Sequence, residues 1–255
     1  MIRGALVVAS ALLLAFIAIP LAGLAFRLPP NQIWAALATP HALAALRLSL
    51  ETTAVSLALT LALGTPLAYV LARGTFPAKR FVDAVVDLPI VVPPAVAGLA
   101  LLLVFGRSGW LGPSLGHAGI RLSFTSAAVV MAQVFVASPF YVRSARAGFV
   151  GVDRVLEAAS ATLGMGPLRT FALVTVPLAF PALLGGAVLS WARGLGEFGA
   201  TIMFAGNLAG VSQTLPLAVY LDLEGGSLDV ATALSVALVA ISLAIVFGLR
   251  LLERR

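Results

Sequence analysis

The sequence contains no cysteine, only one lysine and two histidines, and just 10% of its 255 residues are charged. The absence of cysteine excludes a disulfide scaffold. The single lysine, Lys79, follows Ala78, so the Gly-Lys pair of a phosphate-binding P-loop occurs nowhere in the chain. Two histidines without a thiol supply too few ligands for a zinc site. We therefore expect no enzyme activity, cofactor or metal, and any energy from ATP has to come from a separate protein.

Hydrophobic residues are abundant, at 61% of the chain, and the mean hydropathy is +1.08. Soluble domains have about 45–50% apolar and about 25% charged residues. The apolar residues form runs of about twenty, the length that a helix needs to cross a bilayer. The basic residues are scattered between these runs, so nothing indicates nucleic-acid binding. The composition predicts a polytopic membrane protein in contact with lipid.

The apolar runs predict an all-α membrane protein with six transmembrane helices in a single domain, residues 1–255. Helices are expected because a chain inside the bilayer has to satisfy its own backbone hydrogen bonds. Pro89, Pro93 and Pro94 fall in the third run, which should begin irregularly and become regular only from Ala95. The predicted spans are residues 5–26, 50–72, 84–106, 124–142, 172–195 and 230–251.

The distribution of basic residues predicts that both termini are cytoplasmic, because cytoplasmic segments are enriched in Lys and Arg. The outside loops would then carry four arginines, at positions 27, 47, 107 and 121. The inside segments would carry eleven basic residues: Arg3, Arg73, Lys79, Arg80, Arg143, Arg146, Arg154, Arg169, Arg250, Arg254 and Arg255. The first apolar run is too long for a typical signal peptide, so we expect it to stay as a span.

The largest predicted cytoplasmic segment, residues 143–171, contains a short helix. Asp153 can cap the N-terminus of a helix that begins at Arg154, and Gly164 with Gly166-Pro167 would end it. Two interpretations are open at this point. The helix is either a docking element at the membrane surface or part of a solvated connector.

This segment carries a family resemblance. Glu157-Ala158-Ala159, Leu163-Gly164 and Val174-Thr175-Val176-Pro177 resemble the EAA loop of the permease subunits of binding-protein-dependent ABC importers. The spacing from Glu157 to Gly164 is seven residues, against six in the usual motif. Further similar segments are Ser49–Thr53, Gly64–Ala68, Leu88-Pro89, Pro93-Pro94 and Gly109–Gly112.

The resemblance implies a type I importer permease fold in the inner membrane. It also implies a homodimer, two cytoplasmic ABC ATPase subunits and an external solute-binding protein. The coupling residues that it implies are Asp153, Glu157, Ala158, Ala159 and Gly164.

A second stretch resembles the molybdate-type permeases. It comprises Arg193–Thr201, Ala205-Gly206-Asn207 and Gln213–Pro216. Sulfate-type permeases tend to read GEYGS where this chain has Gly196-Glu197-Phe198-Gly199-Ala200. The resemblance implies import of an oxyanion by alternating access, with molybdate favoured and tungstate inseparable from it. A sulfate or thiosulfate permease, and an ATP-independent secondary transporter, are the alternatives.

The charged residues near the fifth span allow two interpretations. Arg193 and Glu197 are four residues apart and can pair on one helix face. They form either a structural ion pair or, with Phe198 and Thr201, part of the border or gate of an anion route. In the third span, Asp87 is expected to be structural and to pair with an arginine of an inside loop.

Several glycines leave the fifth span with few bulky side chains. Gly196 and Gly199 would permit close helix packing, either within the chain or between two copies.

Overall fold

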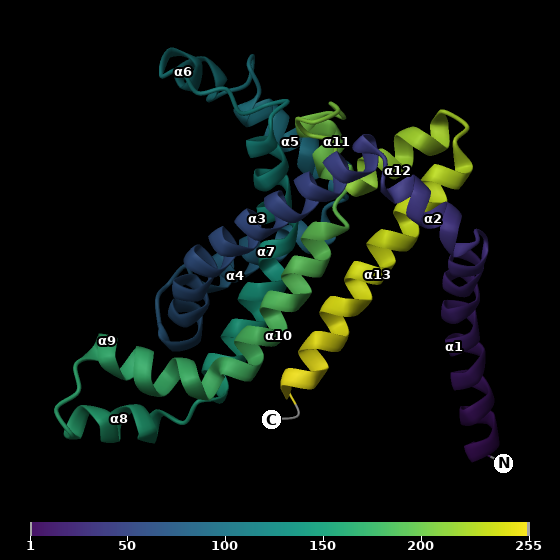
Figure 1. Ribbon diagram of the computed structural model, residues 1–255. Coiled ribbons are helices and arrows are strands. Elements are labelled where there is room, and N and C mark those ends of the chain that lie inside the picture. The colour runs from purple at the N-terminus through teal and green to yellow at the C-terminus, as the bar shows by residue number, and fades with distance from the viewer. Residues whose placement is uncertain (1, 254–255) are drawn as a thin grey trace.

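The computed structural model describes residues 2–253, and every regular element in that range is a helix (Figure 1). Five helices are long and apolar enough to cross a membrane, and a bent helix pair brings the number to six if it is one span. The bent pair is α4 (Lys79–Val91) with α5 (Pro94–Phe105). The long helices are α1 (Ile2–Phe26), α3 (Pro40–Arg73), α7 (Ser126–Gly151), α10 (Val176–Leu195) and α13 (Leu228–Glu253). The predicted all-α membrane fold is confirmed.

Helix α3 begins at Pro40, well before the predicted start at residue 50. Its N-terminus is capped by Thr39, whose hydroxyl accepts a hydrogen bond from the Ala42 amide at 3.3 Å. Arg47 and Glu51, which suggested the later start, form an ion pair of 2.6 Å along the helix surface. A charged pair four residues apart is compatible with continuous helix.

Helix α7 continues to Gly151, beyond the predicted end at residue 142. Arg143 and Arg146 suggested a loop, but both lie on the helix and pair with carboxylates of α4. Arg143 Nε lies 3.5 Å from Asp87 Oδ1, and Arg146 pairs with Asp83. The prediction that Asp87 pairs with an arginine is therefore confirmed, although the arginine belongs to a helix and not to a loop.

The third span is broken: the predicted regular part from Ala95 is α5, which begins at Pro94, but the predicted irregular start was wrong. Helix α4 is regular even though Pro89 lies inside it, and the interruption comes at Val92 and Pro93. Each of these two residues precedes a proline, which disfavours helical backbone angles. Their ψ angles are accordingly 129° and 133°, and the chain turns by 116° between α4 and α5.

The core of the bundle is formed by α7 packed between α3 and α10 (Figure 1). Three aromatic rings meet near one end of this core: Tyr69 of α3, Phe149 of α7 and Phe171 of the turn before α10. The ring centroids of Tyr69 and Phe171 are 4.8 Å apart, and those of Tyr69 and Phe149 are 5.5 Å apart. Phe149 is fully buried. These contacts hold the ends of the three helices together.

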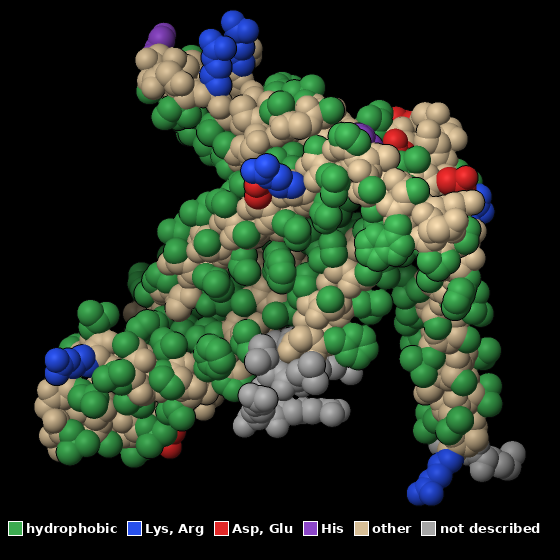
Figure 2. Space-filling model, in the orientation of Figure 1, with side chains coloured by type: hydrophobic (Ala, Val, Ile, Leu, Met, Phe, Trp, Pro, Cys, Tyr) green, Lys and Arg blue, Asp and Glu red, His purple; other side chains and the backbone are tan. Residues whose placement is uncertain are grey.

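The short helices gather at the two ends of the bundle (Figure 1). Helices α8 (Arg154–Thr162) and α9 (Pro167–Thr170) lie at the end where the chain's N- and C-termini are found. The opposite end carries α2 (Pro30–Leu37), α6 (Gly112–His117), α11 (Gly199–Ala205) and α12 (Leu215–Glu224). Hydrophobic side chains cover most of the visible face between the ends, and charged side chains lie mainly near them (Figure 2).

Helices α5 and α11 approach so closely that glycine is required at the contact. A Cβ atom on Gly98 would lie 2.5 Å from the carbonyl oxygen and 2.7 Å from the Cα of Ala200. A Cβ on Gly199 would lie 2.8 Å from Pro94 Cβ. The packing that Gly199 permits is therefore within the chain, whereas a Cβ on Gly196 would meet only Ala192 O, at 3.7 Å.

We expect Gly98→Ala to destabilise the protein by about 1–3 kcal/mol, because the added methyl group meets backbone atoms that have to shift. Unfolding in detergent, followed by intrinsic tryptophan fluorescence, measures the change. Gly185→Ala in α10 is the matched control, since a Cβ there meets nothing within 4 Å and alanine favours helix. Equal melting temperatures for the two variants would contradict the close approach.

Candidate functional site

Helix α8 has well-formed caps at both ends. The Asp153 carboxylate accepts a hydrogen bond from the Val155 amide at 2.9 Å, as predicted for its N-cap. At the C-terminus, Gly164 has a φ of +83°, and the Gly164 and Met165 amides donate to the carbonyls of Ala161 and Ser160. This is a Schellman motif, which favours glycine at the position of Gly164. Gly166 does not extend the turn but caps α9, which begins at Pro167.

One face of α8 is exposed. Ala158 and Ala159 are exposed, and a Cβ on Gly164 would meet nothing within 4 Å. Large apolar side chains lie beside them: Val155 is 68% exposed and Leu163 is 83% exposed. Apolar side chains so open at the end of the bundle form a surface suited to a protein partner.

The opposite face of α8 is held against the chain. Ser160 is buried, and its hydroxyl lies 2.7 Å from that of Thr170 in α9. Glu157 also points inward, where its Oε1 lies 3.1 Å from Arg73 Nη2 and accepts a hydrogen bond of 2.7 Å from Thr175 Oγ1. Of the predicted coupling residues, Ala158, Ala159 and Gly164 lie on the exposed side, while Glu157 does not.

The roles of Arg73 and Thr175 were not predicted from the sequence. Arg73 is one of the basic residues that set the predicted orientation, and Thr175 is one residue of the EAA-like segment. Thr175 is fully buried in a π-helical turn, Phe171–Thr175, where the Val176 amide donates to the Phe171 carbonyl. Pro177 lacks a backbone donor and crowds the preceding turn, which accounts for the widened helix.

Arg193 and Glu197 form the predicted ion pair, with 2.8 Å between Arg193 Nη2 and Glu197 Oε2. The pair does not lie on one continuous helix face, because α10 ends at Leu195. Glu197 Oε1 accepts a hydrogen bond from the Ala200 amide at 2.8 Å, in the first turn of α11. The Glu197 side chain is 1% exposed and the Arg193 side chain 29%. Glu197 therefore joins the end of α10 to the start of α11.

The other two candidate gate residues also face the chain itself. Thr201 is fully buried, and the Phe198 ring packs on Tyr220 of α12 with 5.1 Å between centroids. Only Arg193, of the four candidates, combines a charge with a partly open side chain.

A buried polar stripe along α3 was not recognised from the sequence. Gln133 of α7 is 1% exposed, and its side-chain amide donates to Thr52 Oγ1 at 3.2 Å. Several of the α3 hydroxyls donate to carbonyls of the preceding turn. The stripe consists of Ser49, Thr52, Thr53, Ser56 and Thr60, all buried. It lies inside the chain, between helices, and so serves helix packing.

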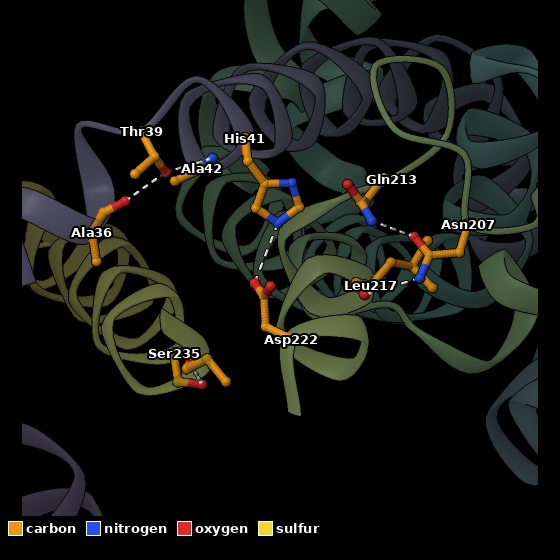
Figure 3. A network of polar contacts seen from close by, with 10 residues as sticks. Ala36, Thr39, His41, Ala42, Asn207, Gln213, Leu217, Asp222 and Ser235 are labelled. Carbon is orange, nitrogen blue, oxygen red and sulfur yellow. Dashed lines mark hydrogen bonds and ion pairs between the residues drawn. The ribbon is translucent and has the colours of Figure 1, made fainter. Parts of the chain in front are cut away.

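A further polar network, at the end opposite α8, involves α3, α12 and the connection before α12 (Figure 3). His41 Nε2 lies 3.2 Å from Asp222 Oδ2, which joins the first turn of α3 to α12. In the connection before α12, Asn207 receives a hydrogen bond from Gln213 at 2.9 Å and donates to the Leu217 carbonyl at 3.1 Å. His41 was predicted in an outside loop; the structure places it on a helix at that end of the bundle.

We expect Glu197→Ala to lower stability by about 3 kcal/mol, because it removes both the partner of Arg193 and the acceptor for the Ala200 amide. Membrane abundance and the melting temperature in detergent test this. Glu51→Ala is the control, since it breaks an exposed pair of the same spacing that contributes at most about 1 kcal/mol. Normal stability of Glu197→Ala with altered uptake would favour the gate interpretation instead.

Comparison with known proteins identifies the family of the chain. Residues 64–255 match the family described as "Binding-protein-dependent transport system inner membrane component". The molybdenum transport system permease protein ModB of Mycobacterium tuberculosis is 43% identical over 91% of this chain and 88% of its own length. ModB of Escherichia coli K12 is 41% identical over 79% of this chain and 90% of its own.

Two other proteins are also similar to this chain. A probable sulfate transport system permease protein, cysT, of Chlorokybus atmophyticus is 34% identical over 88% of this chain and 78% of its own length. A bacterial ABC transporter involved in alginate import has the same fold in its crystal structure. It has a TM-score of 0.78 and 17% identity, and the match covers 100% of this chain and 95% of that one. The chain therefore belongs to the family of binding-protein-dependent transport system inner membrane components.

Proposed function

We propose that this chain is the permease subunit of an ATP-driven importer of molybdate. The observation that carries the proposal is the exposed, doubly capped α8 on a fold of this transport family. Relatives of 41–43% identity that are named for molybdenum transport support the choice of substrate. The Arg193–Thr201 stretch, with its Phe198 and Ala200, supports it as well.

The proposal requires a separate ATPase. The chain has no Gly-Lys pair and so no P-loop of its own. The exposed face of α8, with Ala158, Ala159 and Gly164, is where we place the ATPase contact. Small residues between the apolar side chains of Val155 and Leu163 let such a helix enter a groove closely.

We also propose a homodimer, with one ATPase subunit under each copy and a solute-binding protein at the end that carries α2, α6 and α12. A single copy has its candidate gate residues Glu197 and Thr201 buried within itself, so a route needs a second surface. The termini and α8 would then be cytoplasmic. This orientation rests on the eleven-to-four distribution of basic residues, and those segments lie at one end of the bundle (Figure 1).

Transport would proceed by alternating access. The binding protein delivers the oxyanion, ATP closes the ATPase pair, and the motion reaches the membrane helices through α8. Helices α3, α7 and α10 would move together because they share one core. The elbow at Val92 and Pro93 would let α4 and α5 change their angle without unwinding. The arginines that lie on the described spanning helices α3, α7 and α10 are paired with carboxylates of the chain itself, so selectivity would reside in the binding protein.

Sulfate or thiosulfate is the second candidate substrate, and the 34% identical sulfate-type relative favours it. Tungstate presents the same tetrahedral dianion chemistry as molybdate. A secondary transporter without an ATPase is not supported by the family to which the chain belongs.

The substrate is tested by reconstituting the chain with its ATPase in liposomes. We expect ATP hydrolysis and uptake to rise with a molybdate-loaded solute-binding protein. Tungstate should act similarly, and sulfate should give no stimulation above background. Stimulation by sulfate alone would replace molybdate with the second candidate, and uptake that does not need ATP would overturn the importer proposal.

The ATPase contact is tested by Gly164→Asp. We expect normal membrane levels, because a Cβ at this position meets no other atom of the chain. Binding of the ATPase should weaken at least tenfold, about 1.4 kcal/mol. The added side chain would obstruct the groove, and the left-handed backbone disfavours it. Co-purification and coupled uptake are the measurements.

Gly116→Asp is the control, since it adds the same side chain to open space at the opposite end. Gly164→Asn separates the two causes, because asparagine tolerates the left-handed backbone and yet adds bulk. Full ATPase binding and full uptake by Gly164→Asp would mean that α8 belongs to a solvated connector.

A further inference from the structure

The inward direction of Glu157 gives it a role that its place in the EAA segment does not suggest. Its carboxylate is directed at the ends of two membrane helices and away from the exposed face of α8. Arg73 is the last residue of α3, and Thr175 immediately precedes α10. One carboxylate oxygen, Oε1, receives both the guanidinium at 3.1 Å and the threonine hydroxyl at 2.7 Å.

Arg73 is itself fixed from a second direction. Its Nη2 donates to the Val152 carbonyl at 2.9 Å, in the connection between α7 and α8. It also lies in the last turn of α3, where a positive charge is stabilised by the helix dipole. The Arg73 and Glu157 side chains are only 14% and 18% exposed. The pair is therefore a well-shielded junction of α3, α8, the start of α10 and the end of α7.

Loss of one partner of a solvent-shielded ion pair is strongly destabilising. Removing either partner leaves a charge that is poorly hydrated. A second link lies one turn along α8, where the Ser160 and Thr170 hydroxyls meet at 2.7 Å. With these two links, a displacement of α8 has to carry the ends of the membrane helices with it.

We propose that Arg73 and Glu157 are positioning residues that make α8 move as one body with α3 and α10. The proposal rests on the transport function proposed above and deepens it. It states that Glu157 acts from inside the permease, through Arg73, and is not a contact to the ATPase. The partner meets the other face of α8.

The test is a double-mutant cycle with Arg73→Gln, Glu157→Gln and the double variant, in the full transporter. ATPase affinity, ATP hydrolysis and oxyanion uptake are measured at equal membrane levels. Glu51→Gln serves as the control, because it neutralises one partner of an exposed ion pair far from α8. Thr175→Val is a milder variant, which removes one hydrogen bond to Glu157 and keeps the side-chain volume.

We expect each single variant to bind the ATPase within about twofold of the wild type and to lose about tenfold in uptake per ATP hydrolysed. The double variant should lose no more than the worse single variant, because all three remove one shared interaction. Thr175→Val should lie between the wild type and Glu157→Gln. Tenfold weaker ATPase binding by Glu157→Gln, or losses that multiply in the double variant, would overturn the proposal.

A distance measurement tests the junction independently of transport. Spin labels are attached to cysteines introduced at Ala78, beside the end of α3, and at Ala161 on α8, both exposed in a chain without native cysteine. Glu157→Gln or Thr175→Val should broaden the distance distribution, and Glu51→Gln should not. An unchanged distribution overturns the proposal. A wild-type complex that transports no oxyanion overturns the proposed function while this measurement still decides the junction.

Discussion

The hydrocarbon interior of the membrane provides no partner for a charge or a backbone polar group, and the whole structure depends on this constraint. Glu197, whose side chain is 1% exposed, pairs with Arg193, and the buried Gln133 amide donates to Thr52. The hydroxyls of the stripe on α3 donate largely to their own helix. The side-chain pairs join different elements, whereas the α3 hydroxyls are satisfied within their own helix.

Much of the fold could be predicted from the sequence because apolar length is a local property. The spans and the caps of α8 at Asp153 and Gly164 follow from residues that are close in the chain. Most of the errors fall where distant residues meet, although the start of α3 was misplaced because of the local Arg47–Glu51 pair. The end of α7 was placed too early because the carboxylates that neutralise Arg143 and Arg146 lie on another helix. The prolines mark where the chain breaks between α4 and α5, but they do not reveal the 116° angle or the packing of Gly98 against Ala200 of α11.

In the candidate site, too, local features could be predicted and contacts between distant residues could not. The exposed side of α8 was predictable from its motif, whereas the direction of Glu157 was not, because Arg73 lies far away in the sequence. The one-residue difference in spacing between Glu157 and Gly164 was the only local sign. The Arg193–Glu197 pair was predicted from its spacing. Its second role, holding the first turn of α11, follows from where α10 ends and had no signature in the residues themselves.

The position of α8 beside the bundle has a mechanical consequence. Helices α8 and α9 project to one side of the α3, α7 and α10 core instead of lying beneath it (Figure 1). A force applied at such a point has a lever arm about the core, so it produces a torque. A partner that draws α8 a short way would tilt the membrane helices and sweep their far ends sideways. If α8 is the ATPase contact proposed above, a local pull at one end of the bundle would become a rotation at the other.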